Sequence, residues 1–114
     1  MDNERKYLVI SIKHTTYGWK LGKPCALWGW ERTADDEERC FAGYTLYPTK
    51  AELYTIKEVI DKYGDTIINP NPISMVTVNL CKNYANYDSV LIDIDRYILY
   101  CELFEIPTCA EEDK

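Results

Sequence analysis

Two tryptophans and an arginine lie at alternate positions near residue 30 of the sequence. If this segment is a β-strand, Trp28, Trp30 and Arg32 share one face. Indole and guanidinium groups dominate binding energies at protein interfaces. An indole can also stack on a nucleotide base while a guanidinium binds phosphate oxygens. These three residues therefore predict recognition of a protein or of an anionic ligand.

The segment after Arg32 is dominated by charge. It is too polar for a core, and we expect it to form a turn in water with Phe41 and Tyr44 anchoring it to the core. Short acidic runs are usually hydrated surface, so the run also fits a purely structural role. As part of a recognition surface, it would contribute Asp35, Asp36, Glu37, Glu38 and Arg39.

A third group of polar residues follows the first apolar run of the chain. At the end of a strand, Lys13 and Thr15 share one face and His14 lies on the other. Lys13, His14 and the neighbouring hydroxyl of Thr15 could bind phosphate oxygens together with Arg32. A hydrogen-bonded histidine at a sheet edge is the simpler interpretation of His14. We therefore treat the three residues as candidate binding residues.

Known catalytic patterns are missing from the sequence. It contains no G-x-S-x-G, P-loop or G-x-G-x-x-G motif, and His14 is its one histidine. The five cysteines form no C-x-x-C pair, which argues against a zinc site and against a disulfide framework. We expect free thiols, no metal, no cofactor and no enzymatic activity.

Length and composition indicate a small globular protein. The 114 residues, of which 46% are hydrophobic, suffice for one core, so we expect a single domain over 1–114 with frayed termini at 1–5 and 110–114. No stretch approaches the 18 apolar residues of a membrane-spanning helix, and the acidic N-terminus does not look like a secretory signal. We expect a cytoplasmic protein with no membrane partner.

The charge of the chain is unevenly distributed. The net charge is −6, yet residues 1–32 carry six basic and three acidic side chains. The acidic total argues against binding to duplex nucleic acid, which requires a broad basic surface. A compact anion on the N-terminal half is compatible with this distribution.

The apolar patterns predict strands over 7–13, 25–32, 74–80 and 89–94, and a short strand or extended segment over 40–45. In the first strand, Leu8, Ile10 and Ile12 share a face. Two capping boxes, Thr49 to Glu52 and Thr55 to Glu58, leave open whether a helix begins near residue 50 or 56.

The helix is predicted over 56–63, with a stop at Gly64, and a turn over 69–72. Residues 95–104 fit a strand or, slightly better, a helix capped by aspartate. The predicted fold is α+β, a small, mainly antiparallel sheet with one or two helices packed on it.

The combination of several of these motifs resembles a set of small phage and prophage proteins of uncharacterised function. The likeness covers residues 7–63 and is carried by S-I-K-H-T, the tryptophan strand, R-T-x-D-D-E-E-R, A-G-Y-T and the helix start at Tyr54-Thr55. It implies an accessory protein of a bacterial virus that acts in the host cytoplasm.

Two functions are open at this point. The first is a non-enzymatic counter-defence protein that binds and blocks a host antiviral effector, as anti-CRISPR inhibitors do. The chain's ten tyrosines and three tryptophans favour it, because one small core does not need so many. The alternative is a sponge that sequesters a nucleotide immune signal. Either form could be a homo-oligomer.

Overall fold

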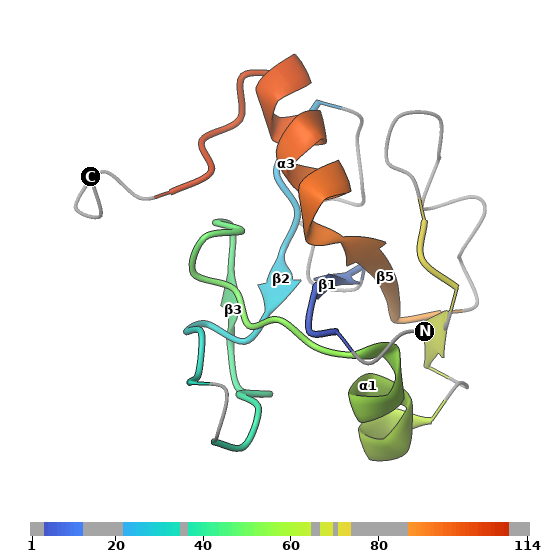
Figure 1. Ribbon diagram of the computed structural model, residues 1–114. Coiled ribbons are helices and arrows are strands. Elements are labelled where there is room, and N and C mark those ends of the chain that lie inside the picture. Colours follow the sequence, from blue (N-terminus) through green and yellow to red (C-terminus); the bar gives the residue numbers. More distant parts are fainter. Residues whose placement is uncertain are drawn as a thin grey trace.

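A five-stranded, mostly antiparallel sheet organises the chain (Figure 1). The computed structural model describes residues 4–12, 22–34, 37–64, 67–69, 71–73 and 87–109. The order of the strands is β3-β2-β1-β5-β4, and only the β4–β5 pair is parallel. The strands are β1 (Tyr7–Ser11), β2 (Leu27–Trp28), β3 (Tyr44–Thr45), β4 (Ile68–Asn69) and β5 (Ser89–Asp93). The predicted α+β class is confirmed.

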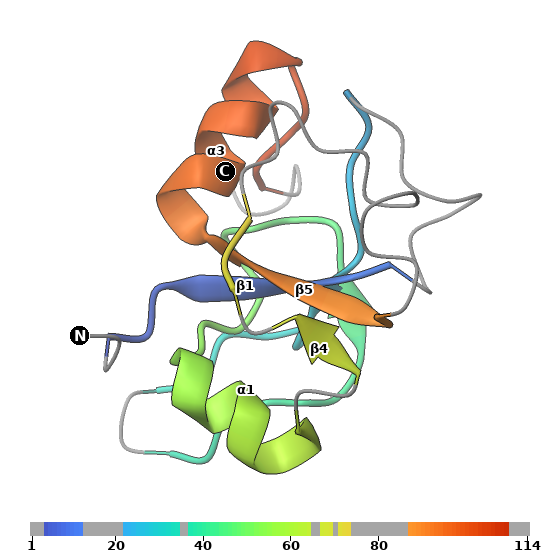
Figure 2. The ribbon, with the colours of Figure 1, turned by 90° about the vertical axis from the view of Figure 1, so that its right-hand side faces the viewer.

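The two central strands are apolar on both faces because each face is covered by a helix. β1 and β5 are antiparallel, with Tyr7 opposite Asp93 and Ser11 opposite Ser89. Leu8 and Ile10 pack in one cluster with Tyr97 and Tyr100 of α3 (Ile94–Leu103). On the opposite face, the cluster contains Tyr7, Val9, Trp28, Tyr54, Val59, Ile68 and Leu91. Figure 2 shows α3 and α1 (Ile56–Tyr63) on opposite sides of the sheet.

Helix α1 begins and ends where its capping residues predict. The Thr55 hydroxyl accepts from the Glu58 amide, and the Glu58 carboxylate accepts from the Thr55 amide. This reciprocal pair satisfies two donors that the helix would otherwise leave open. The chain leaves the helix at Gly64, where φ is 75°. The other candidate start, near residue 50, does not form a helix.

The ambiguous segment near the C-terminus is helical. Asp93 is the N-cap of α3, and its carboxylate accepts from the amide of Asp95 at 2.8 Å. Tyr97, Tyr100 and Cys101 are buried against the sheet. The preceding strand therefore ends at Asp93, close to the predicted boundary at residue 94.

Two predicted strands need correction or lie outside the described residues, and one strand was not predicted. The strand predicted over 25–32 is regular only over Leu27–Trp28, because the chain turns out of the extended conformation at Gly29, whose φ is 76°. The strand predicted over 74–80 lies outside the described residues. The short parallel strand β4 was not predicted, since the prolines after it indicated only a turn.

Four of the five cysteines lie in the described part of the chain, and all four are free thiols, as predicted: Cys25, Cys40, Cys101 and Cys109. Cys81 lies outside the described residues. No helix in the described ranges is long and apolar enough to cross a membrane.

Candidate binding site

Gly29 places the two neighbouring indoles in different environments. Trp28 is buried, and its ring packs edge-on against Tyr63, with 4.8 Å between the ring centroids. Trp30 is 56% exposed and lies across Gly43 of the adjacent segment. The prediction that Trp28, Trp30 and Arg32 share one strand face is therefore wrong, because the positive φ of Gly29 breaks the alternation.

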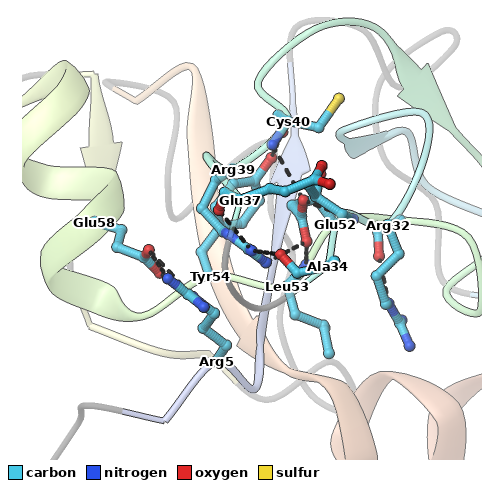
Figure 3. Close-up of polar contacts among 12 residues, drawn as sticks. Arg5, Arg32, Ala34, Glu37, Arg39, Cys40, Glu52, Leu53, Tyr54 and Glu58 are labelled. Carbon is cyan, nitrogen blue, oxygen red and sulfur yellow. Dashed lines mark hydrogen bonds and ion pairs between the residues drawn. The ribbon is translucent and has the colours of Figure 1, made fainter.

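The buried carboxylate of Glu52 fixes the charged loop between Trp30 and Cys40 (Figure 3). One oxygen accepts from the amides of Thr33 and Cys40, at 3.0 and 3.1 Å. The other accepts from the Leu53 amide and from the guanidinium of Arg39. Thr33 lies where the loop leaves the sheet and Cys40 where it returns. The fully buried side chain of Glu52 therefore connects both ends of the loop to the core.

Arg39 supports the loop from inside. It is 9% exposed, and its Nη1 lies 3.0 Å from Glu52. Its Nη2 donates to the carbonyls of Ala34 and Glu37. The expectation that the run up to Arg39 simply turns in water is wrong at this residue, because an acceptor within the core pairs with the charge.

An aromatic cluster supports the returning limb of the loop. Phe41 stacks on Tyr54 with 5.0 Å between the ring centroids, and it also contacts Tyr63. The Tyr54 hydroxyl donates to the Cys40 carbonyl, and burial raises the pKa of this hydroxyl. Phe41 therefore anchors the loop as predicted. Tyr44, the other predicted anchor, is instead 44% exposed.

Arg32 joins the loop to the segment before α1. Its Nε donates to the Ala51 carbonyl at 3.1 Å and its Nη2 to the Pro48 carbonyl at 2.7 Å. Burial lowers the pKa of the guanidinium, and the carboxylate of Glu52 opposes this effect. Two of its donors are thus occupied by backbone carbonyls.

Three exposed apolar side chains gather around the edge strand β3, and we call them the edge patch: Trp30, Tyr44 and Leu46. They are 56%, 44% and 46% exposed. Among the described residues, β3 pairs with β2 alone and forms one edge of the sheet. The loop that follows Trp30 adds the exposed carboxylates of Glu31, Glu37 and Glu38.

A cleft of about 470 Å³ separates this loop from α1. Four carboxylates and three cations line it together with Phe41: Glu37, Glu38, Glu58, Asp61, Arg5, Arg39 and Lys62. Arg5 is paired with Glu58 at 3.0 Å, Arg39 with Glu52, and Lys62 lies over the Phe41 ring. The carboxylates of Glu37 and Glu38 make this cleft unfavourable for a phosphate.

The structure thus sorts the candidate binding residues into three groups. Trp30, Glu37 and Glu38 are exposed; Arg32 is exposed but bound to carbonyls; Trp28 and Arg39 are buried. The remaining candidates, Lys13, His14, Thr15, Asp35 and Asp36, lie outside the described residues. Sequence reasoning missed Glu52, whose position in a T-x-x-E pattern suggested a helix cap.

Comparison of the chain with protein families, with curated proteins and with solved structures gives no match.

Proposed function

We propose that this protein is a non-enzymatic binding protein whose edge patch binds and blocks a partner protein, in the way an anti-CRISPR inhibitor covers its target. The partner, a host antiviral effector in the bacterial cytoplasm, is inferred from the resemblance of residues 7–63 to small phage proteins. The observation that carries the proposal is the exposure of Trp30 on a loop that the Glu52 carboxylate holds in place.

The contacts of Glu52 and Arg39 with the charged loop favour a preorganised interface. A protein that binds with a flexible loop loses conformational entropy on association, which weakens the complex. Here the limbs of the loop are already fixed by Glu52 and Arg39, and its aromatic support is packed in the core. An exposed indole on such a support matches the chemistry of an interface hot spot.

Charge around the edge patch indicates the kind of surface that would bind it. Glu31, Glu37 and Glu38 are exposed on the loop that begins at Trp30, and the whole chain has a net charge of −6. A partner with a basic surface around an apolar pocket would complement these features. The basic nucleic-acid groove of a nuclease is one such surface.

The alternative function, sequestration of a nucleotide signal, would use Trp28 or Trp30 to stack on the base and cations near them to hold the phosphate oxygens. Arg32 and Arg39 both donate to groups within the protein. The cleft beside α1 presents carboxylates to any phosphate. Binding of the phosphate in this alternative therefore rests on Lys13, His14 and Thr15, and the alternative stays a prediction.

Site-specific cross-linking tests the proposal. A photoreactive amino acid replaces Trp30 in one variant and Leu99, an exposed apolar residue of α3, in a matched control. Both variants are expressed in a bacterial host during phage infection and irradiated. We expect a protein adduct from position 30 that is absent or much weaker from position 99.

The adducts are identified by mass spectrometry, and nucleotides released by heating the purified protein are analysed in parallel. A purified partner should then bind the wild-type protein and lose its activity in the complex. Equal cross-linking from both positions, or a bound nucleotide without any protein adduct, would contradict the proposal.

A further inference from the structure

A second, smaller cavity lies on the α1 side of the sheet, beside the β2–β3 edge. Its volume is about 180 Å³. Ser11 and Ser89, which are paired across β1 and β5 and almost fully buried, line its inner part. Three aromatic side chains form most of the rest: Trp28, Tyr44 and Tyr63. We call it the aromatic cavity.

The three rings come from three different elements. Trp28 of β2 is the cross-strand partner of Tyr44 of β3, so their side chains lie on the same face of the sheet. Tyr63 is the last residue of α1, and its ring is inclined at 68° to that of Trp28. The cavity therefore has aromatic walls in more than one orientation.

Electrostatics favour a cation in this cavity. Indole and phenol rings have negative faces that attract cations within about 6 Å of the ring centroid. Asp88 is exposed and is the one charged side chain among the described residues that line the cavity. The net charge of −6 favours a cation further.

The size of the cavity limits the ligand to a small group. Pockets that hold drug-sized ligands have volumes of roughly 300–1,000 Å³, so a whole nucleotide is too large. An alkylated ammonium is weakly hydrated compared with a simple ammonium, and it exposes methyl groups that pack against rings. Aromatic cages of this composition bind quaternary ammonium groups.

We propose that the aromatic cavity binds a methylated or quaternary ammonium head group, with Trp28, Tyr44 and Tyr63 around the methyl groups and Asp88 as the counter-charge. The aromatic cavity is distinct from the edge patch, although Tyr44 belongs to both. Trp30 does not line the cavity, so a Trp30→Ala variant distinguishes the two functions.

The test is a titration followed by calorimetry and by the NMR signal of the Trp28 indole, at constant ionic strength. The probes are tetramethylammonium, choline and 3,3-dimethylbutanol, which has the shape of choline without its charge. We expect saturable binding of both cations and at least tenfold weaker binding of the alcohol. Equal affinity for choline and the alcohol, or no saturable binding of either cation, would overturn the proposal.

Variants locate the binding to the cavity. Tyr44→Ala should weaken choline binding at least tenfold, and the fold should persist because Tyr44 is 44% exposed. Asp88→Asn should weaken it severalfold, and Trp30→Ala should leave it unchanged. If Tyr44→Ala and Asp88→Asn both bind choline like the wild type while remaining folded, the site is wrongly placed.

A comparison of choline with a peptide that contains trimethyl-lysine identifies the source of the head group. Tighter binding of the peptide assigns the cavity to a modified side chain of a partner protein. Tighter binding of choline assigns it to a free or lipid-derived head group. Both outcomes support the ammonium chemistry, whereas preference for an unmethylated lysine peptide would overturn it.

Discussion

Glu52 is the residue on which the arrangement of the charged loop depends most. Four donors converge on its carboxylate, and its partner Arg39 is almost completely buried. The Nε of Arg39 is itself buried and has no hydrogen-bond partner among the described residues. A charge that loses its counter-charge in such surroundings is strongly unfavourable.

We therefore expect Glu52→Gln to lower the free energy of unfolding by about 3–5 kcal/mol, the usual cost of breaking a buried ion pair by removing one partner. Urea denaturation at pH 7 measures the change. Glu38→Gln is the control, because it alters an exposed carboxylate of the same loop. Equal stability of Glu52→Gln and Glu38→Gln would refute the structural role of Glu52.

A second prediction at the scale of single residues concerns Gly29. A Cβ atom at Gly29 would lie 2.4 Å from the Cβ of Glu52 and 2.9 Å from the Cys40 carbonyl oxygen. Gly64 has almost the same φ, but a Cβ there would have no atom of the described residues within 4 Å. A side chain would therefore be strained at both positions, but only at Gly29 would it also meet packed atoms of the described residues.

Gly64→Ala should destabilise by about 1–3 kcal/mol, because φ of 75° and ψ of 175° place Gly64 in a backbone region that is almost exclusive to glycine. Gly29→Ala should cost about 1–3 kcal/mol more, because the new methyl group also displaces packed atoms. Thermal and urea unfolding of the two variants measure the difference. If both variants lose the same stability, the loop packs less closely on Gly29 than the structure indicates.

At the scale of elements, α1 is stabilised by a charged capping residue that responds to pH. Burial opposes ionisation of Glu58, but hydrogen bonds from Arg5 and from Thr55 outweigh it and hold the pKa of the carboxyl below its ordinary value. A carboxyl with a lowered pKa stabilises the folded state above its unfolded pKa of about 4.3. This contribution is lost as the pH falls through the folded pKa.

The stability difference between the wild type and Glu58→Gln should therefore be present at neutral pH and shrink below about pH 4. Urea unfolding of both proteins between pH 3 and pH 7 tests this, with the midpoint and slope recorded at each pH. A difference that is independent of pH would mean that the charge of Glu58 does not contribute.

The elements that the sequence predicts best are those with local signals. The capping box at Thr55, the glycine after Tyr63 and the alternation over Leu8 and Ile10 act within a few residues, so α1 and β1 could be predicted. The early end of β2 could not, because it depends on contact between Gly29 and the distant Glu52.

The restriction to local signals also explains which properties of the candidate site could be predicted from the sequence. Trp30, Glu37 and Glu38 are exposed, which is compatible with their selection as candidates from composition. The spacing argument fails, because Trp28 and Trp30 do not share a strand face. The sequence does not distinguish Arg32 and Arg39 from cations that bind a ligand. Their hydrogen-bond acceptors lie within residues 34–52, and only the folded structure shows these contacts.

At the scale of the whole molecule, the negative charge should govern how fast a partner associates. With a net charge of −6 and exposed glutamates near the edge patch, association with a basic surface is electrostatically steered. Raising the salt from 50 to 300 mM should lower the association rate constant severalfold and change dissociation little. A rate constant that is independent of salt would contradict a basic partner surface.

The most direct test of the central claim is the affinity of the Trp30→Ala variant for the cross-linked partner, measured by calorimetry beside the thermal melt of the same sample. The matched control is Leu103→Ala, which removes an exposed apolar side chain from α3 on another part of the surface. We predict that Trp30→Ala melts within a few degrees of the wild type and binds at least about thirtyfold more weakly, as loss of a hot spot of about 2 kcal/mol requires. Leu103→Ala should bind like the wild type. Wild-type affinity of Trp30→Ala, or equal losses in the two variants, would contradict recognition through the edge patch.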